Sequence, residues 1–454
     1  MYESEDSAYN CTSLDVGRIF LLKRQVYCDT IRFKGGGNSM LLSFTLKNAF
    51  SFLEESTLDM EATNIKAHGY SLLASGDKKV LPIMSIYGAN ASGKSNFVRC
   101  LRYMFEAITE GHSADIIPFL MRRSQLLEES KKLPELSMRF LLNGHEYTLS
   151  ITSAFGRYYG ESLFYRENCK GRERLIYKRL WNNATAKWSL TCGTTIEEAM
   201  IKEIKYVHGM ERNNTPLLLH ALCTRRQHKT FASVAKWTSG FSTTQYRSRG
   251  RADRGLLNTT EKNKHFNYLN EEKNRGEIIT FVQSMNPHII NYRFEKIDHD
   301  NVRATENRYH LVLEYDSKNG DSEKLYDLLI SSYESRGIYS AFTLYPAIMT
   351  ALVNGGVIVI DELENSLHPL LMARIIDMFA DPNVNTGQGQ LVFTTHNALI
   401  MDKKYLRQDE IAFIEMDEYG GSTLYKLSDI DGVRSDLDYC KNYILGSFGA
   451  IPAF

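Results

Sequence analysis

The chain has no net charge, because its 54 lysine and arginine residues balance 54 aspartate and glutamate residues over 454 positions. Without a global positive field, any contact with nucleic acid or an anionic membrane requires a local patch. No run approaches the roughly 18 apolar residues of a membrane-spanning helix. The acidic, polar beginning of the sequence lacks the pattern of a signal peptide. These absences predict a cytoplasmic protein without membrane contact.

The seven cysteines form no framework, because none of them belongs to a CxxC pair. Their scatter argues against a zinc ribbon or a set of disulfides and is typical of a reducing compartment. Internal repeats are absent as well. The length is sufficient for two or three domains.

The chain divides into four segments of different pattern. Residues 1–39 end in Gly-Gly-Gly-Asn-Ser, which is typical of a linker, and we interpret them as a disordered or non-native extension, with a partner-binding tail as the alternative. Residues 40–193 contain strand patterns, a glycine-rich loop, a helical pattern and a period-two region from about 133 that predicts antiparallel strands. Residues 194–287 are mostly helical in pattern, and residues 288–454 return to mixed strands and helices.

The strongest local signal is the segment 88–95, which satisfies GxxxxGK[ST] between a strand pattern and a helix pattern. Its glycines let backbone N–H groups approach phosphate oxygens. Lys94 supplies a mobile positive charge, and the Ser95 hydroxyl is a ligand for Mg²⁺. The residues predicted to surround the nucleotide phosphates are Gly88, Ala89, Asn90, Ala91, Ser92, Gly93, Lys94, Ser95 and Asn96.

Two carboxylates, Asp361 and Glu362, follow a run of four apolar residues. Such a run predicts a strand buried on both faces, which delivers its next residues to the edge of the sheet where α/β proteins bind ligands. We predict that Asp361 binds Mg²⁺ and that Glu362 polarises the attacking water as general base. The pair alone is also typical of a surface strand end. Together with the phosphate-binding loop, it indicates a nucleotide hydrolase.

Two further positions are candidates for contact with the γ-phosphate. His396 ends a strand pattern about 35 residues after Asp361, an order that favours a phosphate sensor over the structural role of most lone histidines. Ser335 and Gly337 begin an amphipathic helix pattern. The N–H groups and dipole of a helix start bind anions, although a serine there is also an ordinary cap.

Together these segments resemble the small ABC-type ATPases of bacterial phage-defence and abortive-infection systems, the Rlo/AbiL-like family with SMC-like heads. The resemblance spans position 40 to the C-terminus. The strings that carry it are MLLSFTLKNAFSF at 40–52, YGANASGKSN at 87–96, YESRGIYSAF at 333–342, IDELENSLHP at 360–369, FTTHN at 393–397 and YILGSFGAIP at 443–452.

The resemblance implies an α/β P-loop fold of the ABC/SMC-head type, with a mixed central sheet, an antiparallel β subdomain and a helical insertion. Residues 40–193 and 288–454 would be the two ATPase lobes, and 194–287 the insertion. It also implies an ATP-dependent homo-oligomer, at least a head-to-head dimer, in which Ser335 and Gly337 reach the γ-phosphate held by the other subunit. A separately encoded effector, a nuclease or toxin, would be controlled by ATP turnover.

The sequence departs from the family pattern at several positions. Phe50 stands where an arginine is usual, and Arg336 precedes Gly337 where Gly-Thr is commoner. His368 replaces the aspartate of transporters. The nearest candidate for the Q-loop glutamine is Gln125.

Residues 225–264 hold ten basic residues against two acidic ones, and they are interleaved with four aromatic residues: Phe231, Trp237, Phe241 and Tyr246. Such a segment can bind nucleic acid through phosphate contacts and stacking. A solvated arm or a docking site for the effector is the alternative. An SMC-like DNA-binding ATPase of repair or recombination is the alternative function, although long coiled-coil arms are missing. A transporter subunit is disfavoured, because no LSGGQ sequence is present.

Overall fold

The computed structural model describes residues 39–111, 133–154, 156–210, 217–244, 264–296, 309–316, 323–326, 336–364, 367–434 and 436–452. The predicted N-terminal extension, apart from its last residue, lies outside these ranges, as do Gln125 and Ser335.

A six-stranded mixed sheet carries the glycine-rich loop. Its order is β11-β15-β16-β5-β17-β18, and all neighbours are parallel except the antiparallel pair β17 and β18. Strand β5 therefore lies between two strands from the C-terminal part of the chain. The strands are β5 (Ile83–Tyr87), β11 (Ser242–Thr244), β15 (Val357–Ile360), β16 (Gln390–Thr394), β17 (Ile411–Met416) and β18 (Ser422–Lys426).

A seven-stranded antiparallel sheet has the order β10-β9-β8-β7-β6-β1-β2. The predicted antiparallel region from about 133 is confirmed, and the first strand of the described chain joins it through β6. The strands are β1 (Met40–Lys47), β2 (Ser56–Asp59), β6 (Glu135–Leu142), β7 (His145–Ala154), β8 (Arg157–Arg166), β9 (Arg174–Asn182) and β10 (Lys187–Cys192). A separate hairpin pairs β3 (Leu73–Ser75) with β4 (Lys78–Val80).

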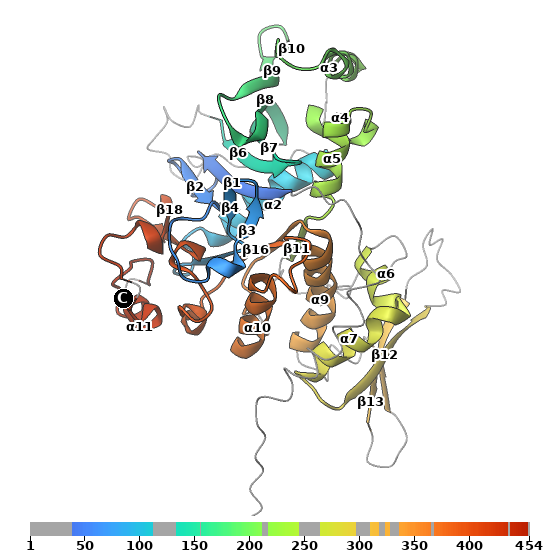
Figure 1. Ribbon diagram of the computed structural model, residues 1–454, viewed down its shortest axis with the longest axis vertical. Coiled ribbons are helices and arrows are strands. Elements are labelled where there is room, and N and C mark those ends of the chain that lie inside the picture. The colour runs from blue at the N-terminus through green and yellow to red at the C-terminus, as the bar shows by residue number, and fades with distance from the viewer. Residues whose placement is uncertain are drawn as a thin grey trace, which may run out of the picture. The chain divides into compact units, whose positions relative to one another are not determined.

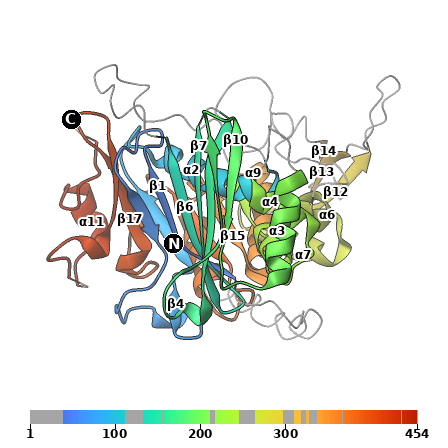
Figure 2. The same cartoon turned by 90° about the horizontal axis from the view of Figure 1, so that it is seen from above.

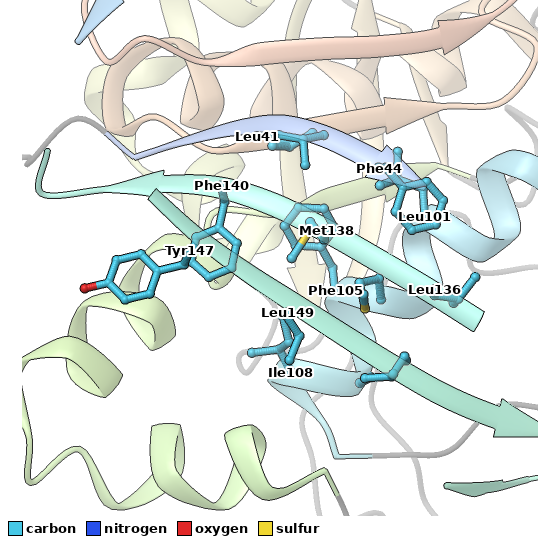
Figure 3. Close-up of a cluster of buried hydrophobic side chains, with 14 of the residues drawn as sticks. Leu41, Phe44, Leu101, Phe105, Ile108, Leu136, Met138, Phe140, Tyr147 and Leu149 are labelled. Atoms are coloured by element: carbon cyan, nitrogen blue, oxygen red, sulfur yellow. The ribbon is translucent and has the colours of Figure 1, made fainter. Parts of the chain in front are cut away.

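Helix α2 (Lys94–Thr109) packs its apolar side chains into a core shared by the two sheets. Among its buried residues, Phe97, Leu101, Met104 and Ile108 recur every three or four positions, and their neighbours widen this stripe into a broad apolar face. Figure 3 shows Leu101, Phe105 and Ile108 of α2 meeting side chains of β1, β6 and β7. This core fixes the helix that follows the glycine-rich loop.

Alternate residues of the central strands face two different cores. In β5, Met84 and Ile86 face the core around α2, whereas Ile83 and Tyr87 face a second core. The second core is covered by helices, which Figure 1 shows mostly in yellow and orange. They are α6 (Lys264–Asn270), α7 (Glu272–Gln283), α9 (Arg336–Asn354), α10 (Pro369–Ala380) and α11 (Tyr439–Ile444). Burial on both faces was the prediction for these strands, and it is confirmed.

The segment 194–287 contains two groups of helices as well as strand β11. The first group packs with α2 beside the antiparallel sheet, as Figures 1 and 2 show. It comprises α3 (Glu198–Met210), α4 (Leu218–Arg225) and α5 (Lys229–Thr238). The second group, α6 and α7, packs against α9.

A three-stranded antiparallel sheet follows α7 and comprises β12 (Ile289–Lys296), β13 (Tyr309–Tyr315) and β14 (Glu323–Tyr326). Tyr292 of β12 packs edge-on against Phe342 of α9. Over the ranges described above, no helix combines the length and the apolar character that crossing a membrane requires.

Candidate functional site

The glycine-rich loop turns between the end of β5 and the start of α2. Ala91 and Gly93 have positive φ angles of 65° and 114°. Backbone in this conformation lets successive N–H groups converge on an anion. Because α2 begins at Lys94, the positive end of its dipole points at the same place. The loop therefore has the backbone of a phosphate cradle.

Two glycines of the loop have no room for a side chain. A Cβ atom on Gly88 would lie 2.3 Å from the carbonyl oxygen of Ile414, and one on Gly93 would lie 2.5 Å from the Ser422 hydroxyl. Both positions also have positive φ angles, so the requirement for glycine is steric as well as conformational.

The outer side of the loop is held by residues far away in the sequence. The Ser422 amide donates to the Ser51 carbonyl at 2.6 Å, and the Ser422 hydroxyl donates to the Ser92 carbonyl at 2.6 Å. Asn96 Nδ2 donates to Ser51 Oγ at 3.0 Å. The hydroxyl of Ser92 is buried without a hydrogen-bond partner among the described residues.

Lys94 is buried inside the loop, where its Nζ donates to the carbonyl oxygens of Gly88 and Ala89 at 2.8 Å each. Burial lowers the pKa of the amine to about 8. Nearby negative charges oppose this shift, which places their carboxylates within electrostatic range of the amine. In decreasing order of effect they are Asp361, Glu364 and Glu362.

The predicted carboxylates lie at the same edge of the sheet as the loop. Asp361 and Glu362 follow β15, and β16 separates them from β5. Thr394, the last residue of β16, donates its hydroxyl to Asp361 Oδ1 at 2.7 Å and accepts from the Glu362 amide at 2.7 Å. The Thr395 amide donates to the Ile86 carbonyl at 3.0 Å. These bonds join the carboxyl ends of three parallel strands.

Asp361 and Ser95 suit a magnesium ion chemically. Carboxylate and hydroxyl oxygens are the ligands that Mg²⁺ prefers. Ser95 is exposed on the first turn of α2, and Thr394 orients the half-buried Asp361 carboxylate. Glu362 is exposed and has a φ angle of 56°. This conformation costs a non-glycine residue about 1–2 kcal/mol, and such strain concentrates at functional sites.

His396 is the first exposed residue after β16. Its amide donates to Glu364 Oε1 at 2.5 Å. Partial loss of hydration and, next, the charge of Lys94 lower the pKa of the imidazole below its usual value. His396 is therefore neutral near pH 7, and it lies within electrostatic range of Lys94 and of the carboxylates.

Gly337 lies buried in the first turn of α9, so the predicted helix is confirmed, while Ser335 falls outside the described residues. The apolar face predicted for this helix is buried, with Phe342 and Leu352 fully enclosed. His368 caps α10 by accepting from the Leu370 amide at 3.2 Å, which gives this departure from the family pattern a structural role.

The stacking part of the nucleic-acid hypothesis for 225–264 is wrong for three of its aromatic residues. Phe231 and Trp237 are buried, and Phe241 stacks on Phe105 with ring centroids 4.2 Å apart. These rings build the core around α2, because burying an aromatic ring stabilises more than exposing it. Tyr246 lies outside the described residues. The basic side chains that are described and exposed are Arg225, Arg226, Lys229 and Lys236.

Several residues that shape the site were not singled out from the sequence. Thr394, Ser51 and Ser422 look like ordinary strand or loop residues, and no local pattern identifies their partners. Glu364 stands inside the DELE string, which was the one available signal.

The loop between β5 and α2, and a carboxylate pair two parallel strands away, define a P-loop NTPase. The chain belongs to the family described as "AAA domain, putative AbiEii toxin, Type IV TA system", whose model matches residues 83–195 and 234–402.

Solved structures that are similar to the chain include the SMC head domain from Thermotoga maritima, at 12% identity and a TM-score of 0.37. The match covers 85% of this chain and 98% of that one. Another is the recombination mediator protein RecF with ATP in the RecFOR pathway, at 11% identity and a TM-score of 0.32, covering 87% of this chain and 100% of that one. No curated protein matches the chain.

Nucleotide affinity is expected to depend on pH, because the pKa of Lys94 is about 8. Below that pH the amine meets the phosphates as a cation. Above that pH the free amine of Lys94 is neutral and must take up a proton when the nucleotide binds. The nucleotide affinity therefore falls by up to about tenfold per pH unit. Titration with a fluorescent non-hydrolysable ATP analogue between about pH 7.5 and about pH 9.5 measures the slope.

The variant Lys94→Arg is the matched control for this titration. The guanidinium keeps its proton throughout this pH range. The variant should therefore bind the nucleotide more weakly, with an affinity that does not change with pH. An equally steep decline in this variant would assign the effect to another group.

Proposed function

We propose that this chain is a Mg²⁺-dependent ATPase of the Rlo/AbiL-like group that controls a separately encoded effector in anti-phage defence. The observation that carries the proposal of hydrolysis is the gathering of Lys94, Asp361, Glu362 and His396 at one sheet edge. A phosphate cradle with both a cation and an aligned carboxylate has the groups that phosphoryl transfer requires.

In this proposal the amides of the loop and Lys94 bind the β- and γ-phosphates of ATP. Lys94 leaves its two carbonyl partners when phosphate oxygens replace them. Ser95 and Asp361 hold Mg²⁺, which neutralises phosphate charge when it is bound. Glu362 takes a proton from the attacking water as general base. His396, as a neutral imidazole, donates to the γ-phosphate.

The proposed oligomer is at least a head-to-head dimer. Gly337, in the first turn of α9, and Ser335, two positions before it in the sequence, would contact the γ-phosphate held by the other subunit. The position of Gly337 in the first turn of that helix supports this role, because helix starts bind anions. ATP would then join two heads, and hydrolysis would release them.

Control of a nuclease or toxin is supported by the family description, which names a toxin–antitoxin system. The strings that resemble those of Rlo/AbiL-like proteins, among them the one at 360–369, favour the same role. Such a system operates in the cytoplasm, where we place this protein.

An SMC-like, DNA-binding ATPase of repair or recombination is the second candidate. The observation that favours it is the row of exposed basic residues on and between α4 and α5, namely Arg225, Arg226, Lys229 and Lys236. The test is to measure ATP hydrolysis with and without DNA. An acceleration by DNA that disappears at high salt would favour this function over effector control.

The full-length chain is expected to release phosphate from ATP with Mg²⁺ and not with excess EDTA, and to elute as a dimer when ATP is present. Co-expression with the product of an adjacent gene should yield a complex whose stability changes with ATP. Absence of Mg²⁺-dependent hydrolysis in both the isolated chain and this complex would reject the ATPase proposal. A neighbouring permease gene would reject the link to defence.

A further inference from the structure

Glu364 lies between the carboxylate pair and His396, yet the mechanism above gives it no role. Its Oε1 accepts a hydrogen bond of 2.5 Å from the backbone amide of His396, a residue 32 positions away. The bond connects the loop after β15 with the loop after β16. Glu364 thus links the proposed base, Glu362, to the proposed phosphate sensor.

The bond between Glu364 and the His396 amide lies where the hydrogen bonds of the central sheet end. Each of the three residues before Glu364 forms a hydrogen bond with Thr394 in β16. Asp361 and Glu362 bond to the Thr394 hydroxyl, and the Leu363 amide donates to the Thr394 carbonyl oxygen at 3.0 Å. The next amide, that of Thr395, still donates to Ile86 in β5. The amide of His396 is the first one after those that bond to the neighbouring strands. Glu364 therefore holds the backbone at a position that the sheet no longer holds.

The other carboxylate oxygen of Glu364, Oε2, is buried and has no hydrogen-bond partner among the described residues. A buried acceptor without a donor is unfavourable for folding. The carboxylate also lies within electrostatic range of Lys94 and His396, because it partly opposes the lowering of both pKa values that burial causes. Glu364 therefore belongs to the same polar site as the proposed base and the proposed sensor.

We propose that Glu364 is a positioning residue that holds His396 against the γ-phosphate, an inference that rests on the proposed ATP hydrolysis. Its bond to the His396 amide limits where the imidazole can reach. Because the same short loop carries Glu362, the base and the sensor keep a fixed mutual position. Loss of the bond frees His396 while the phosphate cradle remains intact.

A double-mutant cycle with Glu364→Ala and His396→Ala tests this role in the full-length chain. Glu364→Ala is expected to lower kcat for ATP about tenfold or more with KM changed little, because a displacement of about 1 Å costs up to about 100-fold. In the His396→Ala background the same substitution should have no further effect, since the group that it positions is gone. Glu364→Gln keeps an oxygen acceptor and should stay within about threefold of wild-type kcat.

A wild-type kcat in Glu364→Ala would overturn the inference, and so would losses that multiply in the double variant. A Glu364→Gln variant as impaired as Glu364→Ala would also overturn it, because the charge and not the bond would then matter. If Glu364→Ala does not fold, Glu364→Met gives the same comparison with the side-chain volume retained. A wild-type chain without hydrolysis rejects the proposed function itself, whereas active wild type with additive variants rejects only this inference.

Discussion

Replacing Lys94 by alanine is expected to lower ATP hydrolysis by roughly 10²–10³-fold, the usual effect of losing one charge-stabilising donor in the transition state. Nucleotide affinity should fall by about tenfold or more, because the lost contacts are charge-assisted. The amine lies inside the loop that would hold the phosphates, bonded to the carbonyl oxygens of Gly88 and Ala89. Phosphate release and binding of a fluorescent ATP analogue measure the two effects.

Lys202→Ala provides the matched control for this experiment. Lys202 lies on α3 with its side chain 74% exposed and paired with Glu198, so its removal should leave both quantities unchanged. Wild-type hydrolysis in Lys94→Ala would mean that the loop at 88–95 is not the phosphate site.

Replacing Glu362 by glutamine is expected to lower hydrolysis by roughly 10²–10⁴-fold while ATP still binds, because an amide cannot accept the proton of the attacking water. The exposed side chain and its unusual backbone angle tolerate an isosteric change, so stability should be retained. ATP should then remain bound and keep the proposed dimer together. Phosphate release, retention of labelled ATP and analytical ultracentrifugation test the three effects.

The matched control here is Glu272→Gln on α7, whose side chain is 80% exposed. It should hydrolyse ATP at the wild-type rate and show no trapped dimer. Hydrolysis that survives in Glu362→Gln would move the role of base to another carboxylate at this edge of the sheet.

Local sequence patterns predicted the elements that carry the proposed chemistry. Largely apolar runs before Gly88, Asp361 and His396 predict buried strands, and β5, β15 and β16 occupy those positions with both faces covered. Because parallel strands end at one edge, the polar residues after them were expected to gather there, and the structure brings them together.

The remaining features depend on contacts that no local pattern encodes. Strand β11 has only three residues and lies in a polar stretch of a segment whose pattern predicts mostly helices. The basic neighbours of the aromatic residues around Trp237 predict an exposed surface, although the aromatic rings enter the core. Ser51 and Ser422 meet at the loop only because β1 and β18 are brought there by the two sheets.

Strand β5 has both of its neighbours, β16 and β17, more than 300 positions later in the chain. During translation at about 5–20 residues per second, the strand that carries the loop waits for tens of seconds without either partner. Closing contacts over such sequence distances is slow. A nascent chain should therefore be unable to bind nucleotide until its last third has left the ribosome, and ATP should protect from proteolysis only chains that extend beyond β18.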